Sequence, residues 1–149
     1  MPRADISMTP EEARTFLAEG RTMTVVTIGP DGMPDPVGMW YLVNDAGEPV
    51  MRTYAKSQKA RNLERDPRYS ALVETGDTYN TLRGLQLSGV IELNRDPEVV
   101  LDIVEGLNDK YALAGGATID RSLMADYASK QVAMTLHVDK VVSWDHRKL

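Results

Sequence analysis

Residues 52–62 read RTYAKSQKARN, and within this stretch the pattern changes from that of a β-strand to that of an α-helix. Ser57 is a favoured N-cap residue, so a helix is expected to begin there. A helix start carries free backbone N–H groups and a partial positive charge, which suit an anion. The Ser57 hydroxyl and the cationic groups of Lys56, Lys59 and Arg61 lie beside that start. The stretch therefore indicates either a local anion site or a solvated basic face of a surface helix.

The segments on both sides of this stretch predict a β-rich fold. Before it, three strand-like segments are separated by tight-turn residues, which is the pattern of an antiparallel meander. After it, helix-like and strand-like segments follow one another up to the C-terminal tail. The six expected strands are Thr22–Ile28, Pro36–Val43, Pro49–Tyr54, Tyr69–Glu74, Leu82–Leu93 and Val132–Trp144. The expected helices begin at Thr9, Ser57 and Asp96, and a fourth covers about Arg121 to Ala128.

Six short antiparallel strands favour a closed or nearly closed barrel, because closure removes exposed sheet edges. We therefore expect an α+β fold that is mainly β, with the helices at the periphery of a six-stranded barrel. No internal repeat or low-complexity linker interrupts the sequence, so residues 1–149 are expected to form a single domain.

Composition excludes several classes of function. The chain has no cysteine, which excludes disulfides, a thiol nucleophile and an iron–sulfur cluster. Its two histidines are too far apart in sequence to indicate a metal site, so none is expected. A net charge of −5 argues against a generic nucleic-acid binder. There is neither a signal-peptide pattern nor an apolar run long enough for a membrane span, so a cytoplasmic location without membrane contact is expected.

A series of short stretches carries a resemblance to a known family. They are Met39-Trp40-Tyr41-Leu42, Arg52-Thr53, Ser57 to Leu63, Asp66-Pro67-Arg68, and Leu82 to Leu85 with Gly89. Together they resemble the flavin and deazaflavin split-barrel oxidoreductases, the relatives of pyridoxamine phosphate oxidase. The ending Val142–Leu149 is similar to endings in the actinobacterial branch that uses the deazaflavin coenzyme F420. This resemblance covers Thr9 to Leu149 and implies a split β-barrel that works as a homodimer, with the cofactor site at the dimer interface.

The resemblance also implies which residues form the site. The phosphate of FMN, or the phosphodiester tail of F420, would lie at the helix start described above. Ser57, Lys59 and Arg61 would then be phosphate ligands, with Lys56 and Asn62 in support.

The tricyclic ring would lie against the second and third strands. Val37, Gly38, Met39, Trp40 and Thr53 would border it, and backbone amides there would bond its pyrimidine edge. Plain barrel packing is the alternative role for these strand residues, and it is favoured for Trp40. Family sites are built across the dimer, so Arg83, Trp144 and His146 are expected to reach the pocket of the neighbouring subunit.

The chain departs from the oxidase pattern in two places. Pyridoxamine phosphate oxidases hold the FMN phosphate with an additional Arg and Lys on the second strand, and residues 37–42 here contain neither. A ring-contacting Gln of the oxidases is matched by Gly84. Vitamin B6 oxidase activity is therefore not expected, and the weakened FMN clamp favours the deazaflavin branch.

The function expected from the sequence is hydride transfer from reduced F420 to a small electron-poor organic substrate. Because the cofactor supplies the chemistry, no side-chain acid is strictly required. Tyr54, Arg83 and His146 are candidate proton donors, and water is the alternative. Two other functions stay open: an FMN-dependent oxidoreductase on the same fold, and a non-catalytic protein that binds a flavin or deazaflavin.

Overall fold

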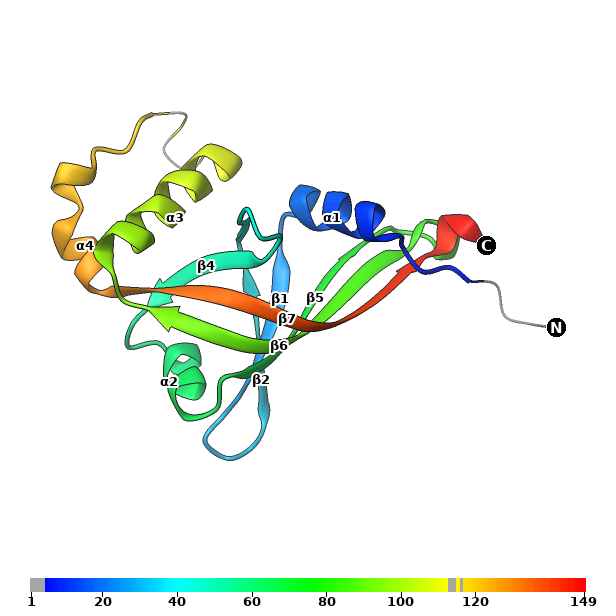
Figure 1. The fold of residues 1–149 in the computed structure, drawn as a ribbon, viewed down its shortest axis with the longest axis horizontal. Coiled ribbons are helices and arrows are strands. Elements are labelled where there is room, and N and C mark those ends of the chain that lie inside the picture. The colour runs from blue at the N-terminus through cyan, green and yellow to red at the C-terminus, as the bar shows by residue number, and fades with distance from the viewer. Residues whose placement is uncertain (1–4, 113–114, 116) are drawn as a thin grey trace.

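The computed structural model describes residues 5–112, 115 and 117–149, and it contains seven strands in one antiparallel sheet (Figure 1). The strands are β1 (Met23–Ile28), β2 (Pro34–Met39), β3 (Leu42–Val43), β4 (Pro49–Tyr54), β5 (Arg68–Thr75), β6 (Arg83–Asn94) and β7 (Gln131–Asp145). Their order across the sheet is β2-β1-β5-β6-β7-β4-β3. The mainly β, α+β class is thus confirmed, but the expected count of six strands is wrong.

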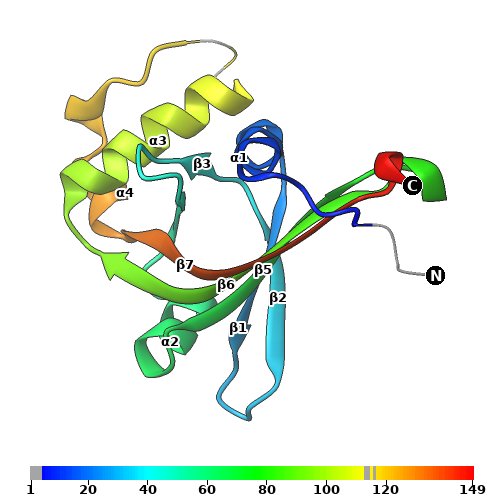
Figure 2. The ribbon, with the colours of Figure 1, turned by 45° about the vertical axis from the view of Figure 1, so that its right-hand side comes forward.

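The seventh strand arises because the segment expected as one strand, Pro36–Val43, breaks at Trp40 and Tyr41. Its first part, β2, pairs with β1 at one edge of the sheet, and its second part, β3, pairs with β4 at the other edge. Only two residues join these opposite edges, so the sheet has to curl almost into a barrel (Figure 2). Tyr41 is fully buried at the break, and its hydroxyl donates a hydrogen bond to the carbonyl oxygen of Leu17. Gly20 leaves room for this phenol, because a Cβ atom there would lie 2.2 Å from the Tyr41 hydroxyl oxygen.

Tight turns set the register of the two hairpins in the meander. Gly32 has φ +82° and Gly47 has φ +80°, a region that glycine adopts without strain. The backbone N–H of Gly32 bonds to the carbonyl of Gly29, and that of Gly47 bonds to the carbonyl of Asn44. These are the tight turns expected between the first three strand-like segments, and both are confirmed.

The helices are α1 (Pro10–Glu19), α2 (Gln58–Arg65), α3 (Pro97–Tyr111) and α4 (Ala125–Ser129). Thr9, Ser57 and Asp96 cap the first three through their side chains, as expected. The predicted helix from Arg121 to Ala128 is wrong in its extent. Residues 121–123 form a 3₁₀ turn, and the non-helical Met124 (φ −108°, ψ 7°) separates this turn from α4.

Two apolar clusters hold the fold together. The first fills the curled sheet and includes Met51, Leu63 and Met134. The second lies on the outer face of β4 and β7, where Ala133 packs with the buried side of α3 and with α4. β4 alternates between the two clusters, since Met51 faces the first and Val50 the second. None of the helices in the described part of the chain is long and apolar enough to cross a membrane.

Part of the sheet forms an arm that extends away from the barrel (Figure 1). It consists of the end of β5, the start of β6 and the end of β7, which pair continuously up to Arg83 and Asp145. Residues 6–8 run beside this arm: the Asp145 N–H bonds to the carbonyl of Ile6, and the Met8 N–H bonds to the hydroxyl of Ser143.

Candidate cofactor site at the start of α2

The turn from β4 into α2 brings three polar side chains together. Lys59 Nζ donates to Thr53 Oγ1 over 2.9 Å, and Thr53 Oγ1 lies 3.2 Å from Ser57 Oγ. Ser57 Oγ accepts the backbone N–H of Ala60 as the helix N-cap. The described residues provide no acceptor for the hydroxyl hydrogen of Ser57, so this group can donate to a ligand at the helix start. Such a donor set, next to a helix N-terminus, fits a phosphate.

Four cations around this turn make no ion pair with any carboxylate in the described part of the chain: Arg52, Lys56, Lys59 and Arg61. Burial, and then the neighbouring charge of Arg52, lowers the pKa of Lys59. The chain has 22 acidic residues and a net charge of −5, so this lack of partners is a local property. An anion bound here would compensate the repulsion between the cations.

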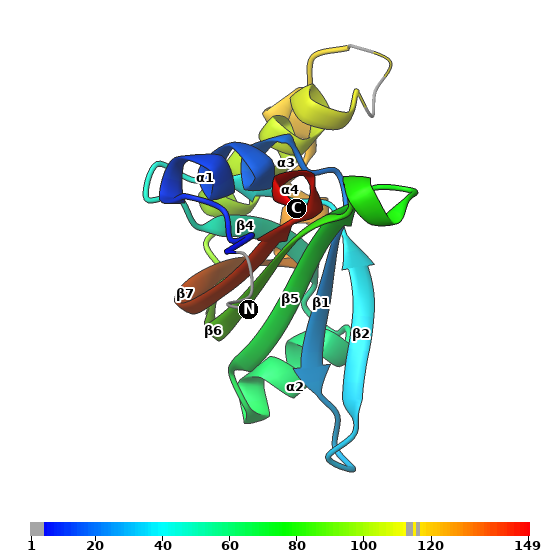
Figure 3. The same ribbon diagram turned by 90° about the vertical axis from the view of Figure 1, so that its right-hand side faces the viewer.

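Asn62, expected as a supporting ligand, is fully buried on the other side of α2. Its Nδ2 donates to Thr27 Oγ1 (3.0 Å) and Asp35 Oδ2 (2.9 Å), and its Oδ1 accepts from Gln58 and Arg65. These bonds fix α2 against the β1–β2 hairpin at the lower end of β1 (Figure 3). Asn62 therefore positions the helix that carries Ser57 and Lys59.

Of the residues expected beside the ring, Thr53 is buried on β4, and the other four lie on the edge strand β2 and directly after it. Val37 and Gly38 are exposed, and they pair with β1 on one side only. Trp40 is 47% exposed and stacks on Tyr111 of α3, with ring centroids 4.6 Å apart and planes at 7°. Backbone groups on the free side of β2 are available to a ligand, as in any edge strand.

The three candidate proton donors are not brought together. Tyr54 ends β4 beside the α2 start and is 60% exposed. Arg83 and His146 lie on the arm instead. The Arg83 guanidinium carbon is 5.1 Å from the centre of the Phe16 ring, and His146 Nδ1 is 2.6 Å from the carbonyl oxygen of Tyr79. Within one chain, therefore, only Tyr54 accompanies the cationic cluster.

Gly84, which stands where the oxidases have a ring-contacting Gln, has a packing role here. It pairs across the strands with Trp144. A Cβ atom on Gly84 would lie 2.0 Å from the indole of Trp144, so the ring occupies the space that a side chain would need.

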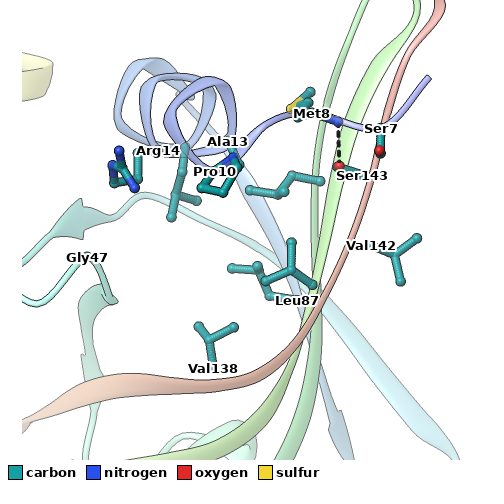
Figure 4. Close-up of a pocket in the computed structure, with 13 residues that line it drawn as sticks. Ser7, Met8, Pro10, Ala13, Arg14, Gly47, Leu87, Val138, Val142 and Ser143 are labelled. Atoms are coloured by element: carbon teal, nitrogen blue, oxygen red, sulfur yellow. Dashed lines mark hydrogen bonds between the residues drawn. The ribbon is translucent and has the colours of Figure 1, made fainter. Parts of the chain in front are cut away.

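An open apolar cavity of about 650 Å³ lies away from the α2 start, between α1 and the arm (Figure 4). Leu87 and Val138 line its floor, Arg14 lies at its α1 side, and Val142 borders it from the other side of β7. Val141, which pairs with Leu87 across the strands, is 52% exposed, so the cavity's face of the arm is partly uncovered in the single chain, while Val142 on the opposite face is 41% exposed.

Two polar residues near the site have no role predicted from the sequence: Arg52, within the stretch 52–62, and Gln131, directly before the last expected strand. Both belong to the β4–β7 ladder beside α2. A polar residue directly before the apolar run Val132-Ala133-Met134 was the available signal for Gln131.

The curled antiparallel sheet and the cationic helix start define a split-barrel protein of the flavin and deazaflavin oxidoreductase superfamily. The family model of pyridoxamine 5'-phosphate oxidase matches residues 9–145, and the chain belongs to this family. No curated protein matches the sequence.

Three solved structures illustrate the relationship. A conserved hypothetical protein from Mycobacterium tuberculosis is 43% identical with a TM-score of 0.87, and the match covers 99% of this chain and 91% of that one. An F420 reductase is 24% identical with a TM-score of 0.70, covering 90% and 98% of the two chains. An FAD-binding protein from Mesorhizobium loti is 16% identical with a TM-score of 0.69, covering 92% and 94%. The last two matches establish the shared fold alone.

Proposed function

We propose that this protein is an oxidoreductase that binds the deazaflavin coenzyme F420 at the start of α2 and transfers a hydride from the reduced coenzyme to a small electron-poor organic substrate. One observation carries the proposal: Arg52, Lys56, Lys59 and Arg61 surround a helix start without any carboxylate partner in the described residues. The likeness to an F420 reductase supports it.

Each part of the site has a role in this proposal. Ser57, Lys59 and the backbone N–H groups of α2 hold the phosphate, and Lys56 and Arg61 add charge at the solvent side. The free edge of β2 from Val37 to Met39 offers backbone donors and acceptors to the pyrimidine edge of the ring.

The bound coenzyme would supply the hydride. The chain's own residues would hold the ring and the substrate close together in the orientation that the reaction needs, and they would keep water out of the site. Tyr54 is the candidate proton donor of the same chain, because its exposed phenol ends β4 next to the cationic cluster.

The proposal includes a homodimer. Arg83 and His146 lie on the arm, remote in the chain's own fold from the α2 start, so they serve a site only if the arm reaches a second copy. Val141 and Val142 project from opposite faces of the arm and are 52% and 41% exposed, so each face presents an apolar side chain that a second copy could cover. Sedimentation analysis should give a dimer, and a monomer would remove both arm residues from the site.

An FMN-dependent oxidoreductase is the second candidate, because the Ser57–Lys59 cluster suits any single phosphate equally well. The two are separated by titrating the purified protein with F420 and with FMN, followed by fluorescence. Turnover of the reduced coenzyme with an acceptor then distinguishes an enzyme from a binding protein, the third function left open.

A further inference from the structure

The apolar cavity between α1 and the arm has the size and the lining of a small-molecule pocket (Figure 4). Its volume of about 650 Å³ falls within the range of about 300–1,000 Å³ that ligand pockets span. Leu17, Leu85 and Leu87 of the main apolar cluster line it, together with the partly buried Val138. Part of the core surface is thus open in the single chain, and an apolar ligand that covered it would be stabilised by the area removed from water.

One face of the arm forms a wall of this cavity. Val141 pairs with Leu87 across the β6–β7 ladder, and Ser143 pairs with Leu85. Directly opposed residues project to the same face, as do alternate residues along a strand, so these four side chains share the cavity's face. The hydroxyl of Ser143 already accepts the Met8 N–H over 2.9 Å. The wall is therefore mainly apolar and carries no charge.

Of the described residues that line the cavity, only Arg14 is charged. It lies toward Gly47, at the end of the cavity opposite to Ser143 (Figure 4). Its guanidinium makes no ion pair with a carboxylate in the described part of the chain. Glu48, which follows Gly47, is bonded to His137, with Oε2 2.6 Å from Nδ1. The cavity thus combines apolar walls with one uncompensated cation at one end.

We infer that this cavity binds an amphiphilic carboxylate, whose aliphatic chain lies along the apolar wall and whose carboxylate pairs with the guanidinium of Arg14. The concave shape favours a small molecule over a second copy of the chain, because a flat protein face would leave such a volume unfilled. Val142 projects from the opposite face of the arm and stays available to a second copy. The cavity lies away from the α2 start, so the inference does not depend on the proposed function.

Calorimetric titration with saturated fatty acids, from octanoate to hexadecanoate, tests the apolar part of the site. Each added CH₂ group should tighten binding by about fourfold until the chain outgrows the cavity, and longer chains should gain nothing further. A lack of saturable binding would overturn the inference. So would an affinity that rises through the whole series, because unspecific adsorption has no limit of length.

Variants of Arg14 test the charged end. Arg14→Gln removes the charge and should weaken dodecanoate binding by roughly tenfold, whereas Arg14→Lys keeps the charge and should retain most of the affinity. Neither variant should change the binding of dodecanol, which has the same chain without a charge. Arg95→Gln is the matched control, since Arg95 is exposed and pairs with Glu64, and it should bind dodecanoate as the wild type does. Wild-type affinity for dodecanoate in Arg14→Gln would contradict the inference.

A bulky side chain at Val141 tests the location. Val141→Trp should abolish the binding of dodecanoate and dodecanol with little change in unfolding temperature, because Val141 is half exposed and a larger side chain there does not crowd the core. Val90→Trp is the control: Val90 is 39% exposed, lies outside the cavity lining and should leave binding intact.

Two outcomes of this last experiment would overturn the inference. If Val141→Trp still binds dodecanoate as the wild type does, the ligand lies elsewhere. If the wild type is a dimer that binds no fatty acid, and Val141→Trp converts it to a monomer, a second copy of the chain fills the cavity.

Discussion

The start of α2 and the arm contain similar numbers of basic residues, but the two regions use them differently. On the arm, Arg147 pairs with Asp145 over 2.7 Å, and Lys148 pairs with Glu12 over 2.8 Å. At the α2 start, Lys59 bonds to the neutral hydroxyl of Thr53, and no ion pair with a carboxylate compensates its charge in the described part of the chain.

Basic residues that form ion pairs contribute to the stability of the fold, whereas basic residues without such pairs are available to a ligand. The arm's pairs tie the chain ends together, since Lys148 also donates to the carbonyl of Ser7. The cations at the α2 start make no comparable ion pair in the described part of the chain. They lower the stability of the folded state, because like charges repel and Lys59 is partly desolvated. Regions that retain such a cost are frequently functional.

The largest expected effect is on ligand binding. The double variant Lys59→Ala/Arg61→Ala should weaken cofactor binding by about 1.5–3 kcal/mol for each charged hydrogen bond lost. Fluorescence titration measures the effect. The double variant Arg95→Ala/Arg68→Ala, which removes two basic residues that already have acidic partners, is the control and should bind as the wild type does. Unchanged affinity in the first variant would remove the α2 start from the site.

A second prediction concerns the scaffold under the site. Asn62→Ala should lower the free energy of unfolding by about 2–4 kcal/mol, because Thr27 and Asp35 lose their shared amide donor inside the protein. Urea unfolding measures it, with the exposed Asn80→Ala as a neutral control. If Asn62→Ala is fully stable but loses cofactor affinity as strongly as the Lys59/Arg61 variant, Asn62 is a ligand and its scaffold role is wrong.

The third prediction tests the packing of the arm. Gly84→Ala should lower the free energy of unfolding by about 1–3 kcal/mol, because the new Cβ displaces the Trp144 indole. The double variant Trp144→Ala/Gly84→Ala should lose less than the sum of the two single losses, since the new Cβ meets no indole once Trp144 is truncated. Thermal unfolding of the single and double variants provides the comparison, and additive losses would contradict this account of Gly84.

The smallest expected effect is the acid dependence of the arm. The hydrogen bond from the Arg147 side chain lowers the pKa of Asp145 to about 2. A carboxyl whose pKa is lowered by folding contributes stability above its unfolded pKa, about 3.9, and the contribution is lost as the pH falls from there toward 2. Asp145→Asn should therefore flatten the decrease in unfolding temperature over this window. Asp77→Asn, which removes an exposed carboxylate without a described ion pair, should keep the wild-type slope.

Local signals in the sequence predicted most of the elements. Gly32 and Gly47 mark turns by their conformational freedom, and Thr9 and Ser57 mark helix starts by their side-chain hydrogen bonds. The break at Trp40 and Tyr41 could not be predicted in this way. It contains no turn residue and follows from the closure of the sheet, which depends on pairings between residues far apart in the chain.

The residues of the candidate site also fall into two groups: those that local sequence signals indicate, and those that only pairings between distant segments bring together. Ser57 and Lys59 were found because they lie two residues apart around one helix start. Asn62 looked like their neighbour in sequence, but the turn of the helix directs it to the β1–β2 hairpin. Gln131 was missed because its position beside Arg52 exists only through the β4–β7 pairing.

The most direct test of the central claim is a side-by-side titration of the cofactor-free protein with F420 and FMN, followed by fluorescence. The account predicts tight binding of F420 and weaker binding of FMN, with both reduced in the Lys59→Ala/Arg61→Ala variant. Binding of neither cofactor, or binding that is insensitive to that variant, would contradict it.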